Sequence, residues 1–414
     1  MLRAYKTELD PTNVQRTSLL RHAGAARWAY NFGLRRKQEV YKAWVDGGKN
    51  GKCSTPSAID LHRELVILKK KPVADGGVPW MYEVSKCAPQ EALRNLDRAY
   101  SNFFRRCKQG VGRKGFPKFK SRKRGIGGFS LTGSIVVGER HVQLPRLGDV
   151  RLKEYGYLPA KGVKILKATV SEKAGRWFVS LQVEQEIVVE KAPDRVLGVD
   201  VGVKSLAVTS DGEVFENPKA LKRAERRLRM LGKAVSRRQK GSSNRRKAVQ
   251  KLARQHYRVA CIRRDAIHKA TSTITKSASV IVIESLNVSG MLKNHRLARA
   301  IGDASLSEFH RQLRYKAAWR NGQVIEADRF FPSSKMCSRC AERKDDLLLS
   351  DREYVCGKCG LVIDRDLNAA INLKKLAASS AVSACCPRSS GHSTVTKLPV
   401  GQEPNTVHSV GING

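Results

Sequence analysis

The sequence has 414 residues, an apolar content of 41% and a formal net charge of +42, which suits a folded protein of two to four domains rather than a basic tail. Such an excess of lysine and arginine destabilises a compact chain by self-repulsion, and nucleic acid is the commonest polyanion that relieves it. An anionic membrane is the alternative partner, but no amphipathic anchor, lipidation motif or bilayer-length apolar run supports it. We expect a cytoplasmic, nucleoid-associated protein with no membrane partner.

The chain is predicted to begin with a strand and continue into helices. Residues 2–9 form the strand, and Asp10-Pro-Thr12 marks the start of a helix that runs to about Trp44 because Pro is favoured in a first helical turn. Further amphipathic helices are expected over 57–70 and 91–107.

From about residue 129 to 188 the apolar residues alternate with polar ones in short strands separated by turns, which favours a small β-barrel. The strand at 2–9 could complete the barrel. We therefore expect a first domain over 1–190, a barrel with a helical recognition region (about 11–125) inserted into it. Residues 190–194 form the predicted linker to the next domain.

A loop at 114–124 interleaves aromatic residues with cations, and its proline breaks regular structure. A charge run is usually a solvated face, but this mixture can stack on bases and contact phosphates. The candidate nucleic-acid-binding residues here are Lys114, Phe116, Lys118, Phe119 and Lys120.

A densely basic helical tract follows at 218–251, broken by Gly241-Ser-Ser-Asn244. So many neighbouring cations are unfavourable without a polyanion beside them, and the break suggests a helix pair that lies along a duplex. The candidate contacts are Arg223, Arg226, Arg227, Arg237, Arg238, Arg245 and Arg246.

Three carboxylates stand at the ends of apolar segments. The buried strand predicted at 196–199 ends in Asp200, a second β-branched run ends in Glu284, and Asp366 precedes a helix expected over 367–376. Each alone could be a solvated strand end or a plain helix N-cap. Strand, Asp-x-Gly, second strand and Asp-Gly turn is also how an RNase H-like nuclease fold begins.

Together the three carboxylates match the needs of two-metal phosphodiester hydrolysis. Mg²⁺ takes oxygen ligands in octahedral geometry, and two ions ~4 Å apart need a carboxylate between them. We expect two catalytic Mg²⁺ ions, with Asp200 as the bridging ligand and Glu284 and Asp366 each completing one shell. Catalysis would then rest on Asp200, Glu284 and Asp366.

Four cysteines, Cys337, Cys340, Cys356 and Cys359, have the spacing C-x2-C-x15-C-x2-C. This spacing is typical of one tetrahedral Zn²⁺, and four thiolates leave no open position, so the zinc would be structural. The spacer is long enough for one hairpin, with Tyr354-Val355 as a strand.

The motifs occur in the order seen in a known family. They are Arg27-Trp-Ala-Tyr-Asn31, Gly115-Phe-Pro-Lys-Phe-Lys120, Gly198-Val-Asp200-Val-Gly-Val-Lys204, Ile283-Glu284-Ser-Leu-Asn287, Phe331-Pro-Ser-Ser-Lys-Met-Cys-Ser-Arg-Cys340 and Asp364-Arg-Asp366-Leu-Asn-Ala-Ala-Ile-Asn372. Over about residues 1–376 the sequence resembles the TnpB/OrfB proteins of bacterial insertion sequences, which are similar to type V CRISPR effectors. One departure is Ala341, where the family usually has glycine after the second cysteine.

The resemblance implies a transposon-associated RNA-guided DNA endonuclease. Its partners would be a guide RNA from the transposon end and double-stranded target DNA, with a short motif beside the target recognised by the barrel and helices. All three matching positions are acidic, which favours an active nuclease. The alternatives are a non-enzymatic RNA- and DNA-binding regulator, or a transposase acting in recombination. The sequence does not indicate an oligomeric state.

The expected fold class is multidomain α+β. An N-terminal, wedge-like β-barrel with an inserted helical bundle would precede an RNase H-like (RuvC-like) α/β nuclease domain over 195–376. A zinc ribbon at about 331–362 would be inserted in the nuclease domain. Residues 377–414 are Ser/Gly/Val-rich and aperiodic, and we expect a disordered tail there.

Overall fold

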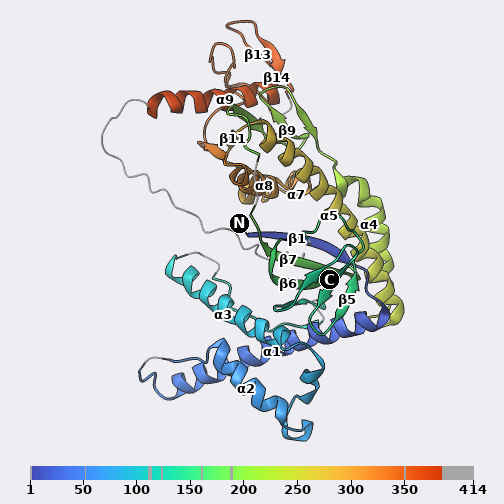
Figure 1. The fold of residues 1–414 in the computed structure, drawn as a ribbon. Helices are drawn as coiled ribbons and strands as arrows, with labels where there is room; N and C mark the ends of the chain where they lie inside the picture. Colours follow the sequence, from blue (N-terminus) through green and yellow to red (C-terminus); the bar gives the residue numbers. More distant parts are fainter. Residues whose placement is uncertain are drawn as a thin grey trace. The chain divides into compact units, whose positions relative to one another are not determined.

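A computed structural model describes residues 2–51, 53–110, 114–122, 125–159, 162–186, 190–348 and 351–384. The chain divides into two compact units (Figure 1). Unit 1 contains Met1–Glu190, Pro218–Lys269 and His295–Ser305, and unit 2 contains Lys191–Asn217, Ala270–Asn294 and the chain from Leu306 onward. Among the described residues, no helix has both the length and the apolarity that a membrane crossing needs.

Unit 1 contains two antiparallel sheets. The larger has the order β1-β7-β6-β2, and the smaller the order β3-β4-β5. Their strands are β1 (Leu2–Leu9), β2 (Gly128–Leu131), β3 (Val136–Val137), β4 (His141–Leu144), β5 (Gly148–Arg151), β6 (Lys164–Lys173) and β7 (Arg176–Glu184). A bridge between Leu9 and Leu152 connects them. The strand at 2–9 therefore does pair with those of 129–188, as expected, while closure into a barrel stays a prediction.

Two helices of unit 1 begin at side-chain caps. The first helices of this unit are α1 (Asn13–Asp46), α2 (Ala58–Lys70), η1 (Val73–Asp75), η2 (Pro79–Glu83) and α3 (Cys87–Lys108). Thr12 and Gln15 form a reciprocal capping box at the start of α1, and Ser57 and Asp60 do the same for α2. These pairs satisfy backbone N–H groups that a helix start leaves without partners, which fixes where each helix begins.

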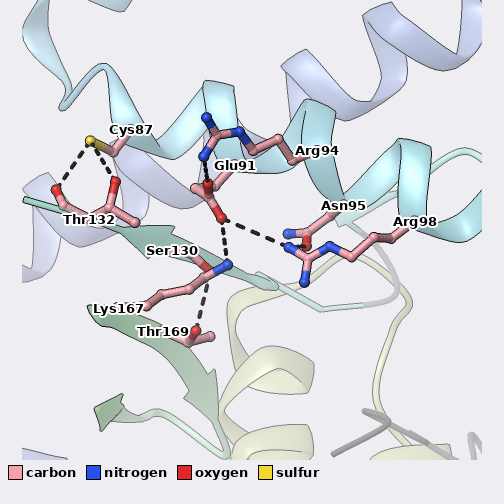
Figure 2. Close-up of polar contacts among 9 residues, drawn as sticks. All are labelled: Cys87, Glu91, Arg94, Asn95, Arg98, Ser130, Thr132, Lys167 and Thr169. Carbon is pink, nitrogen blue, oxygen red and sulfur yellow. Dashed lines mark hydrogen bonds and ion pairs between the residues drawn. The ribbon is translucent and has the colours of Figure 1, made fainter. Parts of the chain in front are cut away.

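A buried carboxylate joins α3 to the larger sheet (Figure 2). Glu91 is only 4% exposed; it lies 2.8 Å from Arg94 and 3.9 Å from Arg98 on α3, and it pairs with Lys167 on β6. Burial raises the pKa of Glu91, but the hydrogen bonds and charges of Lys167 and Arg94 outweigh it, so the pKa is lowered. Glu91 is thus ionised in the fold and ties the helix to the strand.

The basic tract forms α4 (Ala220–Ser236) and the first part of α5 (Ser243–Ser277); the break falls at residues 237–242, earlier than the predicted Gly241-Ser-Ser-Asn244 and overlapping it at 241–242. Lys219 precedes α4 in a left-handed conformation and provides no side-chain cap. Instead Asp303, in α7 (Ala298–Ala304), accepts from the N–H of Leu221 at 3.0 Å and pairs with Arg263 of α5 at 2.9 Å. One carboxylate therefore holds three helices together.

Unit 2 is built on a sheet of order β10-β9-β8-β11-β12. Its strands are β8 (Val196–Asp200), β9 (Ser205–Thr209), β10 (Val214–Glu216), β11 (Val280–Glu284) and β12 (Gln323–Ala327). Strand β9 pairs antiparallel with both β8 and β10, and β11 pairs parallel with both β8 and β12. Both apolar runs that end in a carboxylate are confirmed as strands, at the centre of this sheet. Unit 2 also contains α6 (Val288–Met291) and α8 (Leu306–Trp319).

Helix α9 (Arg365–Ala384) packs across one face of this sheet. The contact is close because β8 has glycine at its centre: a Cβ on Gly198 would lie 2.6 Å from the backbone nitrogen of Lys374 and closer still to the carbonyl of Ala370. The expected end of this helix near Leu376 is wrong. It continues to Ala384, because alanine, frequent in this segment, is the best helix former. The rest of the predicted disordered tail, 385–414, lies outside the described residues.

Candidate functional site

Asp200 and Glu284 stand side by side at the ends of adjacent parallel strands. The parallel register of the two strands pairs Ile283 with Val199, so the next step along each strand brings Asp200 beside Glu284, about 4.8 Å apart between backbones. Because successive side chains alternate between faces, Asp200 projects to the same face as Gly198, which is the face that α9 covers. Glu284 follows Val282, whose side chain packs with Leu373 of α9.

Asp366 approaches the same point from α9. It lies one helical turn before Ala370, the residue that sits over Gly198. One turn along the helix is about 6 Å and two residues along the strand are about 6.6 Å, so Asp366 is within reach of Asp200, and its negative charge acts on Asp200. The expected N-cap role of Asp366 is wrong: Asp364 caps the helix, accepting from the N–H groups of Asp366 and Leu367 at 2.9 and 3.1 Å. The carboxylate of Asp366 is therefore not committed to the cap.

The pKa of Asp200 depends on both of the other carboxylates. Burial raises the pKa of Asp200 well above its usual range, and the negative charges of Glu284 and Asp366 raise it further. The charge of Arg365 and the N–H of Val201 lower it, but by less. A buried carboxylate flanked by two others is a cation site by its chemistry, since a cation offsets both the burial and the repulsion that raise the pKa of Asp200.

The donor atoms of the three predicted metal-ligating carboxylates are less closely grouped than those of the cysteines. Among the described residues, the four cysteines are the set whose donor atoms all lie within 4.8 Å of one another. The carboxylates come from separate elements of unit 2, two strand ends and one helix start. A donor set of carboxylate oxygens is the kind that Mg²⁺ uses.

A buried serine orients one of these carboxylates. Ser333, 2% exposed, donates its hydroxyl hydrogen bond to Oε1 of Glu284. Its own carbonyl accepts from Asn372 of α9 at 2.8 Å. Sequence reasoning did not identify either residue, because a contact across 49 positions has no local pattern. Outer partners of this kind fix the orientation of metal ligands.

Two buried asparagines of α9 hold the segment that leads from Ser333 to the first cysteine. Asn372 also donates to the carbonyl of Met336 at 2.6 Å, and Asn368 donates to the same carbonyl at 2.7 Å while accepting from the N–H of Ser338 at 2.9 Å. Both asparagines are at most 1% exposed. Their spacing of four residues puts them on one helix face, and this pair of amides among the alanines and leucines of the segment was the signal available in the sequence.

The four predicted zinc ligands do come together. The sulfur atoms of Cys337 and Cys359 are 3.6 Å apart, as are those of Cys340 and Cys356. A tetrahedral zinc with Zn–S bonds of about 2.3 Å requires sulfur separations of about 3.8 Å, so spacing and donor type both fit one zinc ion. The N–H groups of Cys359 and Lys358 lower the pKa of Cys356.

The two cysteine pairs have the same backbone turn. In the first, the N–H of Ala341 donates to the carbonyl of Cys337 at 2.9 Å; in the second, Gly360 donates to Cys356 at 3.1 Å. Both turns need a left-handed residue, with φ of 60° at Ala341 and 66° at Gly360. The departure noted at Ala341 therefore places a side chain where L-residues are strained.

The predicted hairpin within the spacer of the zinc ribbon is wrong in its pairing. Strand β13 (Glu353–Val355) does contain Tyr354 and Val355, but it pairs with β14 (Val362–Asp364) beyond the fourth cysteine. The hairpin thus encloses the second cysteine pair rather than the spacer. Fully buried Tyr354 packs with Cys337 and Cys356, which explains the pairing: the strand must lie against the sulfur cluster to bury this ring.

In the loop of unit 1, the candidate nucleic-acid contacts have different roles. Phe119 is 46% exposed, whereas Phe116, 45% exposed, packs edge-on against Tyr100 and Phe103. Lys120 lies with its ammonium 4.0 Å from the ring of Tyr30, and burial lowers its pKa. Lys114 and Lys118 are exposed. All five side chains are exposed, and Phe116 and Lys120 in addition contact rings of α3 and α1.

The basic helices also divide. Among the described residues, no ion pair is formed by Arg223, Arg226, Arg227, Arg237 or Arg246, and all five are exposed. Arg245 instead donates to the carbonyls of Val235 at 2.8 Å and Arg238 at 2.9 Å, so it satisfies the end of α4. Exposed Arg238 bonds to the carbonyl of Asn244. The run of arginines in the sequence predicted a basic surface. It could not distinguish arginines that are exposed from those that hydrogen-bond the carbonyl groups at the end of a helix.

Comparisons with known proteins identify the family of this chain. Residues 178–295 match a family described as "Probable transposase" of the OrfB/IS605 type, 307–373 match "Cas12f1-like, TNB domain", and 1–44 match the family's "Helix-turn-helix domain". A relative from Streptomyces pristinaespiralis named "Putative RNA-guided DNA endonuclease" is 37% identical over 385 residues, covering 92% of this chain and 90% of the relative. One from Escherichia coli (strain K12) with the same description is 32% identical over 97% of both chains.

A solved structure entitled "Structure of the mini-RNA-guided endonuclease CRISPR-Cas_phi3" has a TM-score of 0.46 at 10% identity, over 91% of this chain and 92% of that chain. The sequence matches define a class, the transposon-encoded proteins of insertion sequences. Within it, the chain belongs to the TnpB/OrfB_IS605 family.

Proposed function

We propose that this protein is an RNA-guided DNA endonuclease that hydrolyses phosphodiester bonds at a centre formed by Asp200, Glu284 and Asp366. The observation that carries the proposal is the convergence of these three carboxylates, from two adjacent strands and the helix that crosses them. The strand order of unit 2 supports an RNase H-like (RuvC-like) fold. Along the chain, the antiparallel strands β8, β9 and β10 come first. Strands β11 and β12 then lie on the other side of β8 and run parallel to it.

The residues of the centre have separate tasks. Asp200, on the central strand and between the other two, is the candidate ligand shared by two ions, while Glu284 and Asp366 each hold one. Bound Mg²⁺ ions would activate a water molecule and stabilise the leaving oxygen of the cut strand. Ser333 uses one oxygen of Glu284, which leaves the other oxygen directed to a ligand. Gly198 lets α9 approach closely enough for Asp366 to reach the site.

The remaining parts of the chain would bind the nucleic acids. The net charge of +42 and the exposed arginines of α4 and α5 suit an RNA and a DNA target, since phosphate contacts dominate such affinity. The sheets and helices of residues 1–190 would read a short motif beside the target, as a barrel with an inserted helical region. The four cysteines would hold a structural zinc ion. The names of the relatives, RNA-guided DNA endonucleases, support this division of roles.

The test is to express the chain together with the DNA that flanks its gene, purify it, and sequence the RNA that copurifies. An RNA from the transposon end should be recovered. Replacing the guide segment of that RNA should move the cut in a plasmid to the matching new sequence in the presence of Mg²⁺. Recovery of no RNA, or cutting that ignores the guide, would contradict the proposal. DNA binding without cutting would indicate the regulator instead.

A further inference from the structure

A groove in unit 1 lies between α1 and η2, and none of the three carboxylates or four cysteines lines it. It has a volume of about 390 Å³ and is lined by the rings of Trp28 and Trp80 and by the side chains of Arg21, Arg27 and Asn31. This volume falls in the range of small-ligand sites. Nothing in the proposed cleavage chemistry uses these residues.

The two indole rings are held at right angles. Trp28 stacks on Phe32, with ring centroids 5.3 Å apart and planes 9° apart, and its ring meets Trp80 edge to face at 6.2 Å and 89°. Trp80 is 39% exposed although its neighbour Met81 is fully buried. The short helix η2 is thus anchored through Met81 while it presents Trp80 outward, and the groove wall is a rigid aromatic surface.

Cations surround this surface. Arg21 lies on the rim in an exposed ion pair with Glu83 at 2.8 Å, and such pairs are weak enough to exchange for another anion. Arg27 donates to the carbonyl of Ile126 at 3.2 Å. Asn31 donates to the carbonyl of Lys120 and accepts from its N–H, both at 2.8 Å. The groove is therefore continuous with the loop that carries exposed Phe119 and Lys118.

The floor of the groove is open because α1 has glycine at position 24. A Cβ there would meet only Arg27, at 3.9 Å, so packing does not require glycine. Glycine in a helix interior is unfavourable relative to alanine. Arg21, Gly24, Trp28 and Asn31 follow one another at intervals of three and four residues, so they share one helix face.

We propose that this groove binds one unpaired nucleotide, with the base against the indole rings and its phosphate at Arg21. Indole and guanidinium planes bind any base through its π-face, and they do so without reading sequence. The chain's net charge of +42 makes a polyanion the favoured occupant. The site rests on the nucleic-acid-binding part of the proposed function; the nucleotide could come from a single-stranded part of the guide RNA or of the opened DNA.

The experiment uses the full-length Asp200→Ala protein, so that the probes stay intact. The probes are short single-stranded DNA and RNA oligonucleotides that contain 5-iodouracil, and a fully paired DNA duplex with the same base. Irradiation should crosslink a single-stranded probe to the peptide that contains Trp28 or Trp80, and the more efficient of the two identifies the source. The duplex should not crosslink there because its bases remain stacked.

Two variants test the site itself. Trp80→Leu removes a stacking surface and Gly24→Leu fills the groove; each should lower the affinity for the single-stranded probe about tenfold, the loss of one stacked base, and abolish the crosslink. Gly24→Ala should change neither the affinity nor the crosslink, and it is the matched control for Gly24→Leu because the two differ only in side-chain size. The Gly24 pair keeps the test available if Trp80→Leu fails to fold.

Unchanged affinity in both leucine variants, or crosslinks confined to other peptides, would overturn the inference. So would loss of crosslinking when an acidic aromatic peptide, but not unlabelled oligonucleotide, is present during irradiation, which would indicate a protein partner. The readout is independent of cleavage. A wild-type protein that shows the crosslink but never cuts DNA contradicts only the proposed function, and one that cuts without the crosslink contradicts only this site.

Discussion

Ser333 donates a hydrogen bond to the carboxylate of Glu284, although neither residue lies near the other in the sequence. The backbone of Ser333 is in turn held by Asn372. Through this chain of contacts the helix that carries Asp366 also sets the orientation of Glu284. Two of the three carboxylates therefore depend on the same helix.

Ser333→Ala should lower DNA cleavage at limiting Mg²⁺ by about 10- to 100-fold, the usual cost of removing a partner of a metal ligand. The variant should recover part of its activity at high Mg²⁺, because the carboxylate remains present but is no longer oriented. Titration of cleavage rate against Mg²⁺ measures the shift. Ser333→Thr keeps the hydroxyl and should restore the wild-type requirement; equal loss in both variants would argue for a packing defect instead.

Gly198→Ala should be strongly destabilising. Its new methyl group would meet the backbone of Ala370 and Lys374, and backbone atoms cannot rotate away, so we expect a loss of at least about 3 kcal/mol in the free energy of unfolding. Chemical denaturation measures it. Gly232→Ala in α4 is the control, since nothing lies within 4 Å of its Cβ and alanine favours helix. If both variants were equally stable, α9 would not be packed on β8 as described.

Ala341→Gly should stabilise the zinc ribbon by about 1 kcal/mol, because it removes the strain of an alanine in left-handed conformation. Gly360→Ala, at the equivalent turn with nearly the same φ, should destabilise it by a similar amount. Competition for zinc with a chromogenic chelator compares the two. The same direction of change in both variants would show that the two turns are not equivalent.

Acid should destabilise the fold through His310. Burial lowers the pKa of His310 to about 4, with the charge of Arg314 adding to the effect. The unfolded value is about 6.5, so the contribution is complete above pH 6.5 and is lost as pH falls toward 4. Between pH 7.5 and 5 the loss should be about 2 kcal/mol.

Urea unfolding at the two pH values measures this dependence. His310→Leu should reduce it, since Nε2 of His310 is buried without a hydrogen-bond partner in the described part of the chain and an apolar side chain does not take up a proton. His256→Leu changes an exposed histidine and should leave the dependence as it is. A wild-type slope in His310→Leu would refute the assignment.

The double variant Arg226→Gln, Arg227→Gln should weaken nucleic-acid binding and reduce the slope of log affinity against log salt by about 2, one for each phosphate contact. Arg245→Gln should instead lower thermal stability, because its guanidinium satisfies the carbonyls at the end of α4. Binding measured over a salt series separates the two effects. A larger change of slope in Arg245→Gln would reverse these roles.

Much of unit 2 could be predicted because each chemical group ends a regular element. The apolar runs before Asp200 and Glu284 and the spacing of Cys337 to Cys359 are local patterns, and they identified strands and thiol cluster. Ser333 and Asn372 could not be found this way, because their hydrogen bonds exist only once distant segments meet. The capping role of Asp364 was missed for a different reason: two aspartates two residues apart offer equivalent caps, and only the fold selects one.

In unit 1 the strand pattern predicted pairing but not how the sheets are arranged. The alternation of apolar and polar side chains specifies which face of a strand is buried. The bridge between Leu9 and Leu152 joins residues far apart in the sequence, so it depends on the path of the segments that connect the strands. Likewise, the aromatic residues of the loop at 114–122 looked equivalent in sequence. Their contacts separate Phe116, which packs on α3, from Phe119, which does not.

The central claim is that Asp200, Glu284 and Asp366 act as one centre, and cleavage of a guide-matched plasmid by the Asp200→Ala protein tests it most directly. We predict that Asp200→Ala abolishes cutting while RNA and DNA binding persist, and that Asp211→Asn, which removes exposed ion pairs with Arg195 and Lys374, still cuts. Persistent Mg²⁺-dependent cutting by Asp200→Ala would contradict the account.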